Sequence, residues 1–115
     1  LYKANLSGAD LLEASLCNAD LRGANLSNAS LVLTDLSGAN LSRVSLIRTE
    51  INASWLNDTN LSYANLSNTI IDVSDMAGAD LNGTILINST IKGTNLSKAN
   101  LSNVNLESAN LIDCW

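Results

Sequence analysis

Two copies of one five-residue unit make up the stretch Ala19-Asp20-Leu21-Arg22-Gly23-Ala24-Asn25-Leu26-Ser27-Asn28, and the whole chain repeats this unit. Each copy has a small residue, an Asn or Asp, a Leu, and then two residues that are typical of turns. The Leu position recurs every fifth residue, from Leu1 to Leu111. All 23 of these positions are apolar: nineteen are Leu, and the others are Ile51, Ile71, Met76 and Ile91.

A period of five residues fits neither an α-helix nor a straight strand. On an α-helix, successive Leu side chains would be rotated by about 140° and would form no stripe. On a straight strand, they would alternate between two faces. The chain must therefore bend once per repeat to keep every Leu on one side. All six Gly residues lie two positions after one of these central apolar residues, where a bend needs a permissive backbone.

A second period of twenty residues indicates how many bends make one coil. The small residue two positions before each Leu should point inward beside it, because the two lie on the same face of a short extended segment. At these inward positions, hydroxyl residues recur at Thr34, Ser54, Ser74 and Thr94. Four repeats therefore make one four-sided coil, and just under six coils should stand about 27 Å tall. We expect the buried hydroxyls to hydrogen-bond one another or the backbone.

The pattern resembles the pentapeptide-repeat family, whose motif is A(N/D)LXX, over essentially all 115 residues. The resemblance implies an all-β fold, a right-handed quadrilateral parallel β-helix with four pentapeptides per coil. Residues 1–115 are expected to form a single domain. Departures are local, because Trp55, Ile70 and Ile85 stand where the motif has Asn or Asp, and the chain contains no Phe. The expected core consists of the central apolar residues Leu6, Leu11, Leu16, Leu21, Leu26, Leu31, Leu36, Leu41, Leu46, Ile51, Leu56, Leu61, Leu66, Ile71, Met76, Leu81, Leu86, Ile91, Leu96, Leu101 and Leu106.

The composition excludes most catalytic chemistry. The chain has no His, and therefore no Ser-His-Asp triad and no His metal site. It has no Cys-x-x-Cys motif and no glycine-rich phosphate loop. Cys17 and Cys114 are about five coils apart, too far for a disulfide bond. We therefore predict that the protein is not an enzyme and has no catalytic, metal or cofactor-binding residues.

The net charge of −5 is spread unevenly over the four faces of the coil. Each face is named here after one central residue (Leu6, Leu11, Leu16 or Leu21) and includes the repeats twenty residues apart. The Leu11 face carries five acidic residues against one Lys, and the adjacent Leu16 face carries three against one. The Leu6 face is neutral. The Leu21 face carries three of the six basic residues against two acidic ones: Lys3, Arg22 and Arg43 against Asp20 and Asp80.

Outward-facing apolar residues mark a candidate interaction surface on the Leu11 face, at Leu12, Val32, Leu33, Ile70 and Val73. The alternative is that these are scattered surface residues without a function.

Residues 44–59 match the motif least, and this segment extends the candidate surface with Arg48, Glu50, Trp55 and Asp58. Exposed Trp and Arg side chains are common hot spots of protein interfaces. The alternative is decay of the repeat without a role.

The sequence thus predicts a non-catalytic structural or protein-interaction scaffold with an unidentified protein partner. The alternative is a DNA mimic that binds DNA gyrase or topoisomerase, because some members of the resembled family protect gyrase with an acidic rod. The two acidic faces carry about one net charge per 4.5 Å, against one per about 1.7 Å in B-DNA, which favours the first hypothesis.

Charge, hydropathy and the ends of the rod give further expectations about nucleic-acid binding, membrane insertion, self-association and localisation. No basic patch suited to nucleic acid is present, so we expect no direct nucleic-acid binding. The apolar runs are too short for a transmembrane helix, so we expect no membrane insertion. An open last coil needs a cap: either Trp115 folds over it, or copies associate end to end, or caps lie outside this chain. The cytoplasm is slightly favoured, and an exported compartment is left open.

Overall fold

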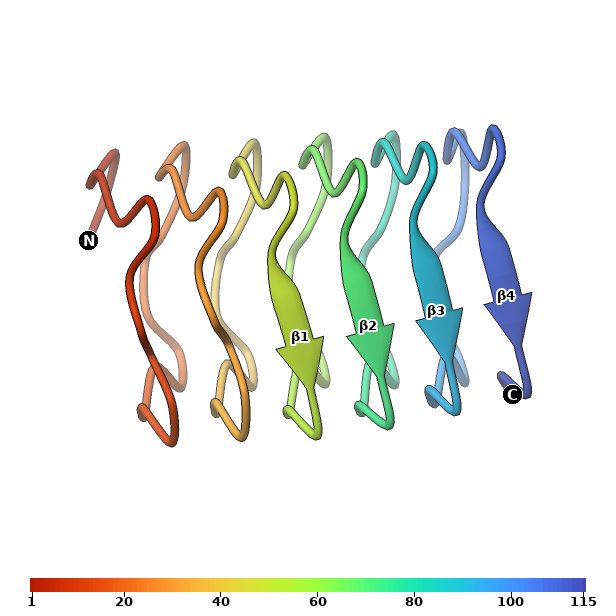
Figure 1. Cartoon of the computed structure of the whole chain (residues 1–115), viewed down its shortest axis with the longest axis horizontal. Helices are drawn as coiled ribbons and strands as arrows, with labels where there is room; N and C mark the ends of the chain where they lie inside the picture. Colours follow the sequence, from red (N-terminus) through yellow and green to blue (C-terminus); the bar gives the residue numbers. More distant parts are fainter.

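The coils predicted from the sequence are stacked side by side into a rod in the computed structural model, which describes all 115 residues (Figure 1). The rod measures 30 × 21 × 21 Å, and the two termini lie at its opposite ends. Every backbone bridge is parallel and joins residues twenty positions apart, such as Asn5 and Asn25. The prediction of a right-handed, four-sided parallel β-helix with four repeats per coil is therefore confirmed.

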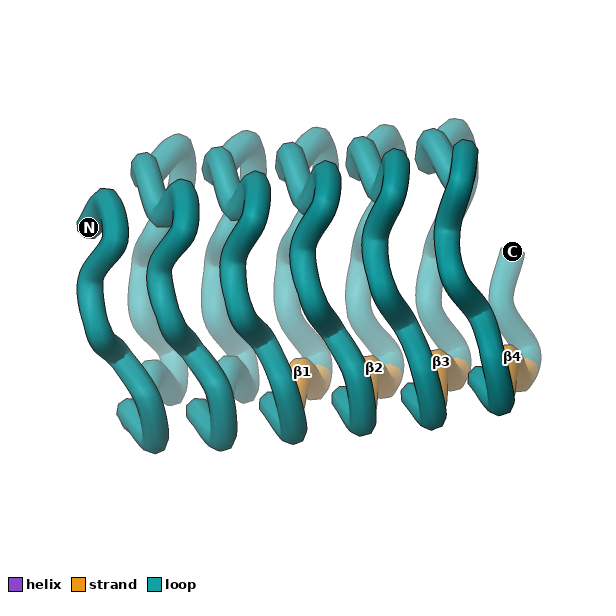
Figure 2. The backbone as a smooth tube through the Cα atoms, turned by 90° about the horizontal axis from the view of Figure 1, so that it is seen from above, coloured by secondary structure: helices purple, strands orange, loops and turns teal.

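Regular strands occur on the Leu11 face alone. These are β1 (Glu50–Asn52), β2 (Ile70–Asp72), β3 (Thr90–Lys92) and β4 (Asn110–Ile112). They form a parallel sheet in the order β1-β2-β3-β4, with Ile51, Ile71, Ile91 and Leu111 in register. Seen from above, the strands lie along one edge of the rod (Figure 2).

The extended Leu11 face differs from the others in the hydrogen bonds of its inward residues. On the other faces the turn is closed by a backbone bond, such as Ala24 N–H to Leu21 O at 3.0 Å. On the Leu11 face two of the corresponding amides donate to hydroxyls instead, Thr34 N–H to Ser54 Oγ and Ser54 N–H to Ser74 Oγ, both at 3.2 Å. The hydroxyl of Ser54 in turn donates to Leu31 O one coil back. The hydroxyls thus bond to the backbone, one of the two outcomes expected from the sequence.

Every corner of the coil places a residue in the left-handed region of the backbone. The second residue after each Leu position has φ between 49° and 70°, at all six Gly and at seventeen other residues. Most of these residues are polar. The aliphatic ones, Leu33, Ala53 and Val73, occupy the same corner in successive coils. A left-handed conformation costs such residues about 1–2 kcal/mol each, so this corner keeps apolar side chains at the expense of stability.

The core is a single column of apolar side chains running through the middle of the rod. The central residues from Leu21 to Ile91 are no more than 2% exposed. Leu6, Leu11, Leu16 and Leu96 are partly buried and pack against this column. Contrary to the sequence-based expectation, Leu101 and Leu106 are 44% and 41% exposed. A central Leu is covered by the coils on both sides, and these two lie in the last coil of the structure, which has a neighbour on one side.

Candidate functional site

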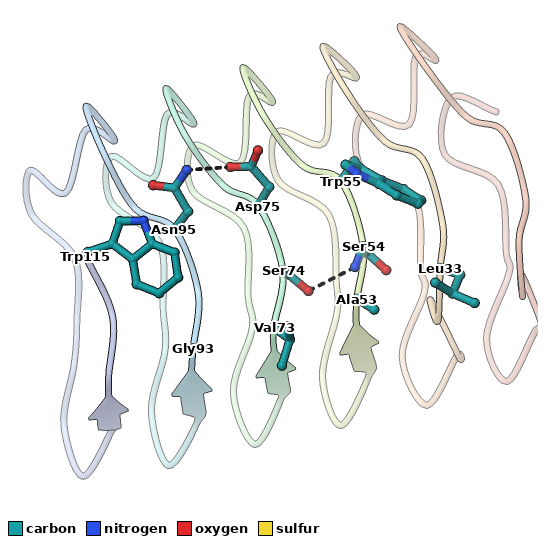
Figure 3. A pocket seen from close by; sticks show the side chains of 10 residues that line it. All are labelled: Leu33, Ala53, Ser54, Trp55, Val73, Ser74, Asp75, Gly93, Asn95 and Trp115. Atoms are coloured by element: carbon teal, nitrogen blue, oxygen red, sulfur yellow. Dashed lines mark hydrogen bonds between the residues drawn. The ribbon is translucent and has the colours of Figure 1, made fainter.

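A shallow groove of about 390 Å³ follows the corner between the Leu11 and Leu16 faces (Figure 3). It spans five coils. Its walls and floor are formed by Leu33, Ala53, Ser54, Trp55, Val73, Ser74, Asp75, Gly93, Asn95 and Trp115. The groove brings together three members of the candidate interaction surface, namely Leu33, Trp55 and Val73.

Two tryptophans bound the groove. Trp55 and Trp115 occupy the same position of the coil, three coils apart, which corresponds to about 14 Å along the rod. Trp55 is 48% exposed and Trp115 is 67% exposed. Asp75 and Asn95 fill the two intervening positions of the column, so polar groups lie between the two rings (Figure 3). The groove therefore combines two large apolar surfaces with a polar centre.

The floor is the corner column of Leu33, Ala53, Val73 and Gly93. The small side chain of Ala53 and the lack of one at Gly93 leave depth on either side of Val73, which is 64% exposed. Val73 has φ 49° and Leu33 has φ 54°. Bulky residues in the left-handed region are outliers, and such strain tends to persist at functional sites. Leu33 and Val73 are exposed and add little to the core, so core packing does not explain why apolar residues occupy these strained positions.

The groove is electronegative. Asp35 and Asp75 lie one coil on either side of Trp55. Interactions with the side chain and the backbone N–H of Ser37 lower the pKa of Asp35, and this N–H donates to Asp35 Oδ1 at 2.9 Å. Asp75 accepts the backbone N–H of Ala77 and the side-chain amide of Asn95, both at 3.0 Å on Oδ1. Its Oδ2 has no partner and is free to accept a hydrogen bond from a ligand.

The other residues predicted for the surface lie outside the groove. Leu12, Arg48, Glu50, Asp58 and Ile70 are exposed but belong to other columns of the coil.

Val32, expected to point outward, is only partly exposed. It is the first residue after a Leu position, and in the central coils this position is shielded by the coils on either side, which lie about 4.8 Å away.

Sequence reasoning missed Trp115, Asp75 and Asn95 as parts of this site. The sequence does indicate that the two tryptophans share one column, because Trp55 and Trp115 are sixty residues apart, which is three full coils. Trp115 does not fold over the last coil. Its N–H donates to Thr94 O at 3.3 Å and its carbonyl accepts from Leu96 N–H, which holds it in the same column as Trp55.

The arrangement offers apolar and electrostatic contacts, and no constellation of reactive groups. No three His, Cys, Asp or Glu side chains lie together in a way that could hold a metal ion. Cys17 and Cys114 are both free thiols. No helix is present that is long and apolar enough to cross a membrane.

Known proteins share both the repeat and the coil. A family model described as pentapeptide repeats matches in eight copies, over residues 1–38, 34–62, 54–103 and 74–111. The crystal structure of the pentapeptide repeat protein Rfr23 from the cyanobacterium Cyanothece 51142 superimposes with a TM-score of 0.93 at 19% identity, covering 96% of this chain and 89% of that one.

A pentapeptide repeat protein from the Arabidopsis thaliana thylakoid lumen gives a TM-score of 0.83 at 22% identity, covering 85% of this chain and 68% of that one. Comparison with curated proteins finds no significant match. At these identities the two structures establish the fold.

Proposed function

Because this chain belongs to the pentapeptide-repeat family, we propose that it is a non-catalytic scaffold that binds a partner protein through the groove between Trp55 and Trp115. The observation that carries the proposal is the run of aliphatic residues at one corner of the coil. Leu33, Ala53 and Val73 occupy left-handed positions at which the other corners have mostly Gly or polar residues. A rod that served only as a spacer would gain stability by placing Gly or Asn there.

The backbone limits how a partner can bind to the side of the rod. Main-chain N–H and C=O groups are used between neighbouring coils, as in the bonds from Leu36 N–H to Trp55 O and from Trp55 N–H to Thr34 O. No strand edge is therefore available along the groove for pairing with a partner strand. Recognition must depend on side chains, and Trp is among the residues most enriched in interface hot spots.

The chemistry of the groove indicates the kind of segment that it accepts. The rings of Trp55 and Trp115 offer apolar surface, and the carboxylates of Asp35 and Asp75 lie next to Trp55. A Lys or Arg side chain could contact both a Trp ring and the free Oδ2 of Asp75. We therefore expect an exposed partner segment that carries an apolar side chain close to a basic one.

An affinity capture with three baits tests the proposal: the wild-type protein, Trp55→Ala and Tyr63→Ala. Tyr63 is a matched control, because it is an aromatic residue that is 59% exposed and lies on a different corner. Captured proteins are identified by mass spectrometry and then rebound as purified proteins. The proposal expects at least one partner that binds wild type and Tyr63→Ala equally and loses at least about tenfold in affinity for Trp55→Ala.

Two results would contradict the proposal. A purified partner that binds Trp55→Ala as tightly as wild type would place the interaction elsewhere on the rod. Equal weakening by Trp55→Ala and Tyr63→Ala would indicate a general effect of surface aromatic residues.

The acidic Leu11 and Leu16 faces favour DNA mimicry as a second candidate function. Their excess negative charge lies on two adjacent sides, on a rod about as wide as a DNA duplex. A DNA gyrase supercoiling assay tests this candidate. Protection of gyrase by micromolar protein, abolished when the acidic side chains are neutralised, would support it, and the absence of protection would refute it.

End-to-end self-association is a separate proposal, based on the exposed Leu101, Leu106 and Leu111 of the last coil. Light scattering over a range of protein concentrations tests it. A molar mass that rises with concentration would support it, and a constant monomer mass would refute it.

A further inference from the structure

A second pocket lies at the corner diagonally opposite the groove, between the Leu21 and Leu6 faces. It has a volume of about 410 Å³ and is lined by Tyr2, Lys3, Arg22, Gly23, Ser42 and Arg43. Three of the six basic residues of this acidic protein thus converge on one pocket, from three successive coils. We propose that this pocket binds a small anion that carries a phosphate or sulfate group. The proposal is independent of the function assigned to the groove.

Gly23 creates the space that the basic side chains surround. Lys3, Gly23 and Arg43 occupy the same corner in successive coils, so Lys3 and Arg43 start about 10 Å apart. Gly23 has φ 65° and no side chain of its own, and Lys3 Cγ lies 3.5 Å from the place where its Cβ would be. Long flexible side chains on both sides of such a gap can close on an anion from two directions.

The cations of the pocket are only partly neutralised by the protein itself. Arg22 donates to both oxygens of Asp20 at 2.8 Å, in the only ion pair of the structure. Lys3 and Arg43 have no carboxylate within ion-pair distance. They lie instead near aromatic rings, Lys3 Nζ at 5.2 Å from the centre of the Tyr2 ring and Arg43 Cζ at 5.9 Å from that of Tyr63. Two unpaired cations therefore remain available to a ligand.

Ser42 adds a hydroxyl donor to the pocket. At the equivalent positions of two other coils the hydroxyls are used internally, Ser62 donating to Asn60 Oδ1 at 2.6 Å and Ser102 to Asn100 Oδ1 at 2.7 Å. The hydroxyl of Ser42 makes no such bond, and Asn40 Oδ1 accepts only the backbone N–H of Ser42. An oxyanion in the pocket would thus meet a guanidinium, an ammonium and a free hydroxyl, which is a donor set suited to phosphate or sulfate.

The charge distribution of the rod restricts the size of the ligand. The acidic Leu11 and Leu16 faces meet at the opposite corner, and the rod is 21 Å across. At about 0.1 M salt the Debye length is about 10 Å, so a small anion at the basic corner is largely screened from the acidic faces. A long polyanion such as duplex DNA extends beyond the pocket and approaches the acidic side chains. The site therefore favours a compact anion over a nucleic-acid duplex.

Titration of ¹⁵N-labelled protein with inorganic diphosphate, at constant ionic strength, tests the proposal by NMR. We expect saturable shifts of the backbone amides of Lys3, Gly23 and Arg43. Arg43→Gln should weaken diphosphate binding about tenfold, because a charge-assisted hydrogen-bonded contact is lost. The matched control is Arg48→Gln, which removes the same charge from an exposed residue at another corner and should leave the affinity within about twofold.

Asp20→Asn should raise the affinity for diphosphate, whereas Arg43→Gln lowers it. It releases Arg22 from its ion pair, so diphosphate should bind roughly two- to fivefold more tightly than to wild type. A parallel titration with a sulfated disaccharide distinguishes a sulfate ligand from a phosphate ligand, since the better binder identifies the group that the pocket prefers.

Three results would overturn the proposal. The first is that neither the diphosphate titration nor the sulfated-disaccharide titration reaches saturation. The second is an equal loss of affinity in Arg43→Gln and Arg48→Gln, which would show a general effect of net charge. The third is tighter binding of a 20-base-pair duplex than of diphosphate, which would make the corner part of a nucleic-acid surface. Far-UV circular dichroism establishes that each variant keeps the wild-type fold.

Discussion

Replacing Leu56 by Ala should destabilise the protein far more than the same replacement of Leu101. Leu56 is fully buried, and the loss of its side-chain carbons removes about 2 kcal/mol of transfer free energy. The coils on either side are fixed by backbone bonds, such as Leu56 N–H to Asp75 O at 2.7 Å and Leu36 N–H to Trp55 O at 2.8 Å. They cannot close the cavity, so we expect a total cost of about 2–5 kcal/mol.

Leu101 provides the matched comparison, because it has the same place in the repeat but is 44% exposed. Its replacement removes roughly half of the transfer term, about 1 kcal/mol, and creates no enclosed cavity. The two variants therefore differ only in whether a coil covers the side chain from both sides.

Urea unfolding followed by far-UV circular dichroism and by Trp fluorescence measures both costs. Coincidence of the two signals establishes whether the rod unfolds as one unit, which repeat proteins do not always do. A difference of less than about 1 kcal/mol between Leu56→Ala and Leu101→Ala would refute the argument that stacked coils cover the central residues and supply most of the stability.

Three further outcomes are expected. Thr69→Val should cost about 1 kcal/mol in urea unfolding, because the buried hydroxyl loses its 2.7 Å hydrogen bond to Leu46 O; an unchanged midpoint would contradict this. Val73→Asn should raise the unfolding free energy by about 1 kcal/mol, because Asn tolerates φ 49° better than a β-branched residue; a loss of stability would show that Val73 packs more than its exposure indicates. Acidification should lower the melting temperature as the pH falls from about 4 towards 2, because the Arg22 side chain lowers the pKa of Asp20 from 3.8 to about 2. The ionised Asp20 stabilises the fold above the unfolded pKa, and this contribution is lost as the pH falls through the folded pKa, so Asp20→Asn should show a shallower decline.

The candidate site was only partly predictable from the sequence. Trp55, Leu33 and Val73 stood out because they break the polar pattern of the outward positions, and the structure places all three in one groove. Trp115 has the same chemistry, but sequence reasoning considered it only as one of three ways to cover the last coil. The basic corner was visible only as a slight charge imbalance of one face, because the pocket depends on the gap at Gly23.

The five-residue and twenty-residue periods by themselves determined the four-sided coil, its number of turns and the residues that point inward. This was possible because each repeat contacts the repeats twenty positions before and after it, so the sequence carries the complete list of neighbours. Only the tertiary structure decided which side chains are exposed and where a groove forms, because both depend on how neighbouring side chains pack. In the structure Leu101 and Leu106 are exposed, Val32 is partly shielded, and a groove lies between Trp55 and Trp115. Exposure and depth depend on the volumes of all neighbouring side chains together, and no single position in the repeat specifies them.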